Sequence, residues 1–237
     1  MNEKNGYIIE EFDELPSTND YAKEKRENRR NLIVTAKRQT GGRGTKGRSF
    51  SSEEGGIYLS ALTFHENLKA KEAFKIMANA ATAVCRTLSA YGIEPCIKWP
   101  NDIHVNGKKI CGILIENGFS GTNVDFSVVG IGVNVYNRLP EELLTIATTL
   151  SAELKKELSA KELSEVKERL IEEYIKGSSM EEYLSFVGYK NKRIYVITQN
   201  ERIPATLLSV DDEGGLLVEI GGETRRFTAA EISVRTE

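Results

Sequence analysis

Apolar and polar positions alternate in two different ways along the chain, and the change falls near residue 187. In the first part, apolar residues at helical spacing from 71 to 91 predict a core helix, and the charged stretch 139–177 predicts a longer one. A short helix is expected at 180–186. Asn106-Gly107 has the composition of a two-residue hairpin turn. The strands predicted in this part are 7–12, 32–36, 57–64, 103–105, 109–116 and 124–135, with a turn at 118–123.

After residue 187 the helical patterns stop and short β-rich runs follow, separated by turn residues. These runs lie at 193–198, 203–210, 215–220 and 224–228. About fifty residues of short strands predict a small β-barrel of the SH3-like type. The fold class is therefore predicted as α+β: a mixed β-sheet domain at 1–187 and an SH3-like C-terminal domain at 188–237.

A basic, glycine-rich stretch follows the predicted strand 32–36. Its four glycines between residues 41 and 47 allow positive φ angles and close approach of the backbone to a ligand. Five cations lie between Lys37 and Arg48, in a chain whose net charge is −3. The stretch therefore predicts an anion-binding loop that is loose when empty and ordered by its ligand, although a basic surface loop remains an alternative.

Three familiar glycine motifs do not fit this loop. A dinucleotide-binding loop leads directly into a helix, whereas here a strand follows Phe50 after a few polar residues. The kinase glycine loop requires companion motifs that the chain lacks. A phosphate-binding P-loop would have lysine at the position of Arg48.

Composition narrows the chemistry further. No signal-peptide pattern and no run of about eighteen apolar residues is present. The three cysteines are not in a Cys-x-x-Cys arrangement, which favours reduced thiols in a cytoplasmic protein. Two histidines argue against a zinc site or a histidine-based triad. A pI near 5.7 gives no general attraction to nucleic acid.

Several residues in or beside the predicted elements could serve either the fold or a ligand. Ser17 or Thr18 is suited to cap a helix or to bind a ligand. Lys109 opens an apolar strand, where it could be a solvated end or project into a pocket. Gly130 and Gly132 lie inside a central strand, which indicates close approach of backbone or ligand.

The order of these motifs resembles the biotin protein ligases, that is, the biotin–[acetyl-CoA-carboxylase] ligases. The resemblance covers nearly the whole chain, and it rests on the glycine–arginine loop 42–48, on Lys98-Trp99-Pro100-Asn101-Asp102 and on the run 109–116. It implies a class II synthetase-like catalytic domain of the biotin/lipoate ligase type. It also implies activation of biotin with ATP and Mg²⁺ to biotinyl-5′-AMP, and transfer of biotin to a lysine of a biotin carboxyl carrier protein domain.

The resemblance also assigns expected roles to individual residues. Lys109, Arg43 and Arg48 would be catalytic. The biotin-binding residues would be Ser17, Thr18, Asn19, Gln39, Arg43, Gly44, Thr45, Lys109 and Gly112. The ATP-binding residues would be Arg48, Lys98, Asn101, Asp102, Asn134 and Arg235, and no protein metal site is expected beyond Mg²⁺ carried by ATP.

The chain departs from the family pattern at two points. Larger members that repress the biotin operon carry an N-terminal helix-turn-helix domain, whereas the catalytic pattern here begins near residue 7. We therefore expect no repressor role and no nucleic-acid or membrane partner, with a homodimer as one candidate assembly. Thr45 replaces an arginine that some members carry, which bears on retention of the adenylate.

Two alternative functions remain open from the sequence. A lipoate ligase or an octanoyltransferase shares the fold, but its acyl chain would make less use of Ser17, Thr18, Asn19 and Gln39. A non-catalytic biotin-sensing or protein-interaction module would not need Arg43 and Lys109.

Overall fold

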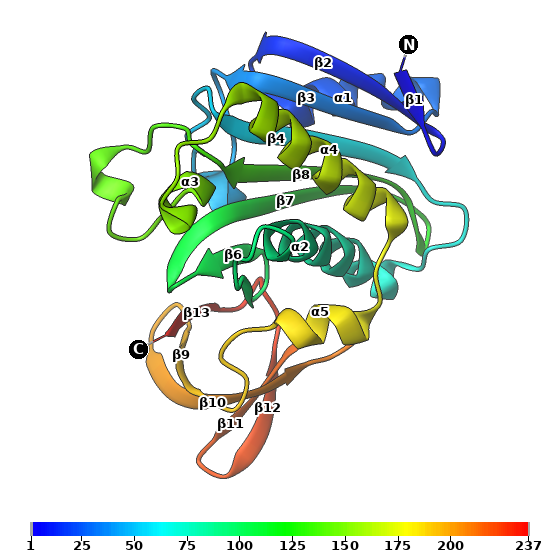
Figure 1. The fold of residues 1–237 in the computed structure, drawn as a ribbon. Coiled ribbons are helices and arrows are strands. Elements are labelled where there is room, and N and C mark those ends of the chain that lie inside the picture. Colours follow the sequence, from blue (N-terminus) through cyan, green and yellow to red (C-terminus); the bar gives the residue numbers. More distant parts are fainter. Residues whose placement is uncertain (1, 237) are drawn as a thin grey trace.

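Two β-sheets organise the chain in the computed structural model, which describes residues 2–236. The larger sheet has eight strands in the order β1-β2-β3-β4-β8-β7-β6-β5 (Figure 1). Only β2 and β3 among them pair in parallel, so the sheet is mixed as the sequence predicts. Its strands are β1 (Asn2–Lys4), β2 (Tyr7–Leu15), β3 (Leu32–Gln39), β4 (Gly56–Phe64), β5 (Cys96–Lys98), β6 (Asp102–Val105), β7 (Lys108–Ser120) and β8 (Asn123–Asn134).

Helices cover both faces of this sheet. The short helix α1 (Thr18–Glu24) packs on one face through Ala22, over Val34, Leu62 and Val128. The long helices α2 (Phe74–Ser89) and α4 (Ala160–Lys176) pack on the opposite face and against each other (Figure 1). Two further short helices are α3 (Leu150–Leu154) and α5 (Met180–Phe186). The glycine-rich loop lies beside α1, where its Arg43 pairs with Asp20 of that helix.

The C-terminal strands form a five-stranded antiparallel sheet in the order β12-β11-β10-β9-β13, which confirms the small β domain. Its strands are β9 (Arg193–Ile197), β10 (Arg202–Val210), β11 (Leu216–Ile220), β12 (Glu223–Phe227) and β13 (Ser233–Thr236). Between residues 2 and 236, the ladder runs from β12 to β13 without closing into a ring. The two sheets share one apolar core, and Trp99 Nε1 donates to the Gly214 carbonyl oxygen across the junction at 3.0 Å. The boundary at residue 187 stays a prediction.

Two local predictions are wrong. The stretch 139–177 is not one helix: a loop precedes α3, and Lys155 breaks the helical path with a φ of 51° before α4 begins. Two capping residues explain the new starts, because the hydroxyls of Thr149 and Ser159 accept from backbone N–H groups of α3 and α4. The turn predicted at 118–123 is also shorter, because β7 continues to Ser120.

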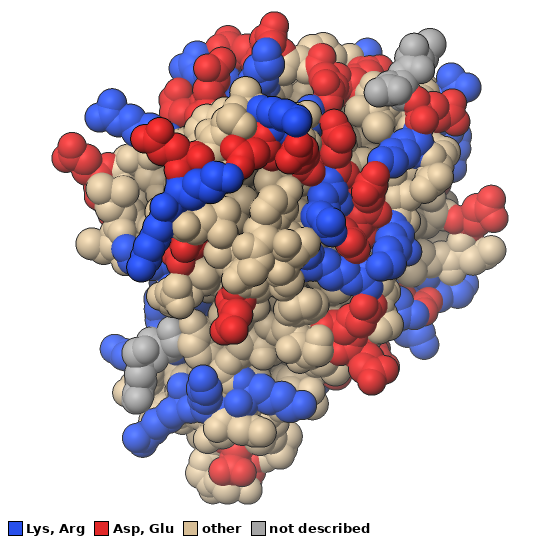
Figure 2. Space-filling view, viewed as in Figure 1, with Lys and Arg blue, Asp and Glu red and all other residues tan. Residues whose placement is uncertain are grey.

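The surface carries both signs of charge. On the face shown in Figure 2, Lys and Arg side chains alternate with Asp and Glu over the large sheet and α4. Many of these charges are paired, for example Lys4 with Glu172 at 2.6 Å and Lys167 with Glu11 at 2.5 Å, which link α4 to β1 and β2. Among the described residues, no helix combines the length and the apolar character needed to cross a membrane.

Candidate functional site

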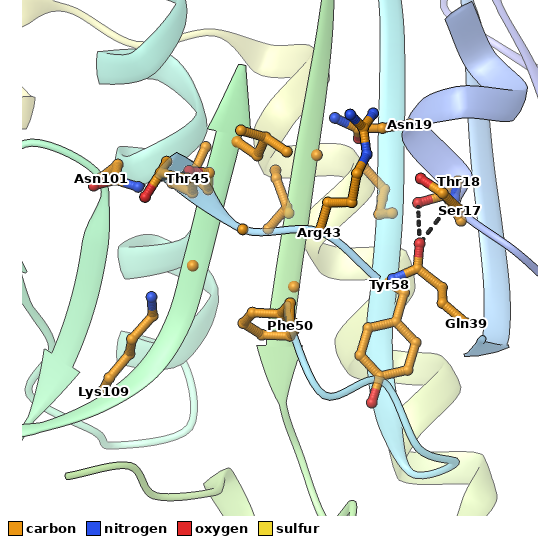
Figure 3. A pocket seen from close by; sticks show the side chains of 18 residues that line it. Ser17, Thr18, Asn19, Gln39, Arg43, Thr45, Phe50, Tyr58, Asn101 and Lys109 are labelled. Atoms are coloured by element: carbon orange, nitrogen blue, oxygen red, sulfur yellow. Dashed lines mark hydrogen bonds between the residues drawn. The ribbon is translucent and has the colours of Figure 1, made fainter. Parts of the chain in front are cut away.

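A cleft lies on the α1 face of the large sheet, between α1, the glycine-rich loop and strands β4, β7 and β8 (Figure 3). Its volume is about 50 Å³, and it opens to solvent. Ten of the predicted site residues line it: Ser17, Thr18, Asn19, Gln39, Arg43, Gly44, Thr45, Asn101, Lys109 and Gly112. Four separate segments of sequence therefore meet at one site.

One end of the cleft is a network of small polar side chains. The side-chain oxygen of Gln39 accepts from the backbone N–H of Thr18 at 2.8 Å and from its hydroxyl at 3.0 Å. The Gln39 amide donates to the Ser52 hydroxyl at 2.9 Å. Ser60 Oγ lies 2.7 Å from Thr18 Oγ1 and 2.5 Å from Asn19 Oδ1. These donors and acceptors are fixed by one another, which suits recognition of a neutral polar group.

Helix α1 holds this end in place. Ser17 is its N-cap, with the hydroxyl accepting from the backbone N–H of Asp20 at 3.2 Å, as one of the two sequence interpretations predicts. The capping interaction also brings Thr18 and Asn19, both buried, to the edge of the cleft. The capping and ligand-binding interpretations are therefore compatible.

The other end of the cleft is cationic. Lys109 Nζ pairs with Asp102 Oδ1 at 2.6 Å, and both side chains are about one third exposed or less. Both backbone polar groups of Lys109 bond to the loop before α3. Its N–H donates to the Ile146 carbonyl, and its own carbonyl accepts from the Thr148 N–H, each at 2.9 Å. Asn101 donates to the Ile113 carbonyl at 2.8 Å. Figure 3 shows the Lys109 ammonium and the polar residues at opposite sides of the cleft.

Arg43 lies between these ends, on the glycine-rich loop. Its guanidinium pairs with Asp20 at 2.5 Å and with Glu116 at 3.0 Å. Glu116 also accepts from Lys23 at 3.0 Å and from the Asn19 amide at 3.3 Å. Burial raises the pKa of Glu116, but the hydrogen bonds from Lys23 and Asn19 and the charge of Arg43 lower it by more, so Glu116 is held ionised.

The glycines in the sheet make room for side chains of the same chain. A Cβ on Gly132 would come within 2.5 Å of the Phe50 ring, and one on Gly112 within 3.2 Å of it. These two glycines are directly paired across β7 and β8, so they form a flat platform for Phe50. A Cβ on Gly130 would lie 2.3 Å from Asn19 Oδ1. Close approach at both strand glycines is therefore confirmed.

Five predicted residues do not line the cleft. Asp102 still contacts it through Lys109. Burial lowers the pKa of Lys98, and the positive charge of Arg235 lowers it further. Asn134 is buried and bonded within the chain, donating to the Thr148 carbonyl at 3.2 Å. The fifth, Arg48, is exposed, as is Arg235.

Sequence reasoning missed the aromatic and apolar lining of the cleft, which comprises Phe50, Tyr58, Leu59, Ile113, Leu114 and Ile131. Phe50 ends the basic loop, and its ring meets that of Tyr58 edge-on at 6.5 Å. A large apolar residue inside a polar loop is the signal that could have identified it. Burial raises the pKa of Tyr58 well above its ordinary value, and its hydroxyl donates to the Glu53 carbonyl.

The fold is that of a class of solved ligases. The chain is 29% identical to the biotin protein ligase of Aquifex aeolicus solved with biotin and ATP, with a TM-score of 0.73 over 98% of this chain and 99% of that one. A point mutant of that protein, solved with biotin, gives a TM-score of 0.74 at 28% identity, over 97% of this chain and 98% of that one.

Sequence comparison leads to the same class. The family model described as "Biotin/lipoate A/B protein ligase family" matches residues 11–134, more than half of the chain. The chain belongs to this family. It is 31% identical over 214 residues to the bifunctional ligase/repressor BirA of Bacillus subtilis, covering 85% of this chain but 66% of the relative, just under two thirds. It is also 38% identical over 105 residues to the biotin–[acetyl-CoA-carboxylase] ligase of Paracoccus denitrificans, 43% of each chain.

Proposed function

We propose that this chain is a biotin–[acetyl-CoA-carboxylase] ligase. It activates biotin with ATP to biotinyl-5′-AMP and transfers the biotinyl group to a lysine of a biotin carboxyl carrier protein domain. The observation that carries the proposal is the division of one cleft into a neutral polar end and a cationic end. Biotin has the matching pattern, because a neutral ureido ring and a carboxylate lie at its two ends.

At the polar end, the proposal assigns the ureido ring to Ser17, Thr18, Asn19 and Gln39. Their hydroxyl and amide groups offer both donors and acceptors, which the ureido N–H and carbonyl groups require. The apolar side chains of Phe50 and Leu114 would pack against the hydrocarbon part of the ligand. Arg43, Gly44 and Thr45 would close over it from the loop.

At the cationic end, attack of the biotin carboxylate on the α-phosphate joins two negatively charged groups. Lys109 would offset their repulsion and stabilise the charge that builds up in the transition state. The ion pair with Asp102 holds the Lys109 ammonium in the cleft before substrates arrive, which supports this role. The new C–O–P bond forms as pyrophosphate leaves, and a closed loop would protect the mixed anhydride from water.

Of the six residues predicted to bind ATP, one, Asn101, lines the cleft. The proposal assigns ATP to Arg48, Lys98, Asn101, Asp102, Asn134 and Arg235. The positive charge of Arg235 acts on the Lys98 ammonium, which supports a phosphate subsite beside the C-terminal sheet. No cluster of three or more His, Cys, Asp or Glu is arranged for a metal among residues 2–236. The proposal keeps Mg²⁺ as an ion that enters with the phosphates of the substrate ATP.

The acceptor is the carrier domain of a carboxylase, as the name of the Paracoccus relative indicates for that protein. The three free cysteines, two of them buried, support a reducing, cytoplasmic location. We also propose a homodimer as the assembly. Within each chain, we propose a division into two domains at residue 187.

The test is ATP–pyrophosphate exchange with biotin or lipoate as the acid, followed by incubation with a carrier domain and mass measurement of the carrier. We expect exchange with biotin and not with lipoate, and one biotinyl group on the carrier. Exchange driven by lipoate would favour the lipoate-ligase alternative. Tight biotin binding without exchange would instead support a biotin-sensing module.

A further inference from the structure

The polar side chains around the cleft form one hydrogen-bond network that begins and ends in the glycine-rich loop. In this network Arg43 pairs with Glu116, and Glu116 accepts from the Asn19 amide at 3.3 Å. The Asn19 side-chain oxygen in turn accepts from the Ser60 hydroxyl at 2.5 Å. The network continues from Ser60 through Thr18 and Gln39 to Ser52. Ser52 Oγ donates to the Phe50 carbonyl at 3.0 Å, which returns the network to the loop. The loop is thus bonded at both of its sides to the side chains of the polar end.

Glu116 holds a central place in this network, because its carboxylate binds three side chains from two elements. It is bonded to Lys23 of α1, to Asn19 at the start of α1 and to Arg43 of the loop, from its position on β7. Its side chain is 24% exposed, whereas Asp20, the second partner of Arg43, is 51% exposed. The Glu116 contacts are therefore screened less by solvent than the Asp20 contact.

We propose that Glu116 is a positioning residue that fixes the Arg43 loop and the Asn19 amide relative to each other. Through it, a ligand at the polar end and the loop above the ligand are stabilised together. This inference rests on the proposed function for the identity of the ligand, but not for the position of the loop. Glu116 itself does not line the cleft, so it acts through Asn19 and Arg43.

The first arm of the test needs no ligand. Trypsin is added to the native full chain, and cleavage after Arg48 is followed by mass spectrometry. Glu116→Gln removes the charge but keeps the shape, and we expect cleavage about fivefold faster than in the wild type, as for loss of one charge-assisted bond. Glu116→Asp keeps the charge and should give an intermediate rate. The control is Glu14→Gln, which removes a carboxylate–arginine pair with Arg38 outside the cleft.

The second arm measures biotin-dependent exchange and the AMP released per biotinyl group transferred. Glu116→Gln should raise KM for biotin about fivefold and release more AMP without transfer, with kcat changed less. Glu14→Gln should match the wild type in both measurements. A residue that serves only stability would lower the amount of active protein without changing KM or this ratio.

The outcomes separate the two proposals. If the wild type shows no exchange, the proposed function fails, and the trypsin arm still decides the role of Glu116. If the wild type shows exchange and Glu116→Gln matches it in cleavage, KM and AMP release, the positioning role fails alone. Should Glu116→Gln not fold, the order of cleavage rates between wild type and Glu116→Asp decides, and equal rates refute the role.

Discussion

Replacing Gly130 by alanine tests how closely Asn19 is packed at the polar end of the cleft. An added Cβ would lie 2.3 Å from Asn19 Oδ1, and an ordinary contact begins near 3.4 Å, so the oxygen must retreat by about 1.1 Å. That movement breaks the contact with Ser60 at 2.5 Å and misaligns the bond to Glu116. The φ angle at Gly130 lies outside the left-handed region, so the backbone itself accepts alanine.

The expected cost follows from these contacts. Two hydrogen bonds contribute about 1 kcal/mol each, and an off-rotamer side chain costs about 1 kcal/mol more. Gly130→Ala should therefore lower the free energy of unfolding by about 3 kcal/mol. In an Asn19→Ala background the clash has no partner, so the same change should cost less than about 0.5 kcal/mol, since alanine is otherwise at least as favourable as glycine in a strand.

Urea unfolding, followed by the fluorescence of the single tryptophan, measures all four chains of this double-mutant cycle. A coupling energy of about 2.5 kcal/mol between the two positions is expected. An equal cost of Gly130→Ala in both backgrounds would show that Asn19 does not fill the space above this glycine. Biotin affinity measured on the same four proteins should fall in every variant that displaces or removes the Asn19 amide.

Three other predictions concern single contacts. Lys109→Ala should lower biotin-dependent pyrophosphate exchange by about 10²–10³-fold with little loss of stability; Lys108→Ala, which removes a bond to a loop carbonyl, is the control and should change exchange less than about twofold. Trp99→Phe should lower the free energy of unfolding by about 1–2 kcal/mol in calorimetry, because it removes the buried bond to Gly214; an unchanged Tm would contradict that contact. Because the pKa of folded Glu116 is lowered, its stabilising effect should be present above the ordinary value of 4.5 and lost as pH falls through the folded pKa. Wild type and Glu116→Gln should therefore converge in stability as pH falls below 4.5, and a difference that stays constant until the protein unfolds in acid would refute this assignment.

Local signals in the sequence were enough for most elements of the fold. Asn106-Gly107 fixed the β6–β7 hairpin, because the two-residue turn leaves little choice of register. The hydroxyls of Ser17 and Thr18 predicted the start of α1 by the same kind of local rule, and the structure assigns the cap to Ser17. All the residues that the family resemblance groups as biotin-binding then lie in one cleft.

The loop before α3 could not be predicted in this way. Its apolar residues, among them Leu144 and Ile146, have a spacing compatible with a helix, yet both are more than half exposed. The backbone of the loop bonds instead to Lys109, more than thirty residues earlier in the chain. Helical periodicity reports local amphipathicity only, so it cannot detect a backbone partner supplied by a distant strand.

The position of Glu116 shows where local rules could have gone further. Successive side chains in a strand point to opposite faces, so Gly112, Leu114 and Glu116 share one face of β7. Gly112 was already predicted to face the ligand, and the same period therefore directs Glu116 toward the cleft face. A carboxylate there, near a loop that carries five cations, implies pairing with one of them. Only the identity of the partner could not be predicted from the sequence. The structure shows that it is Arg43, because α1 and the loop converge on the end of β7 where Glu116 lies.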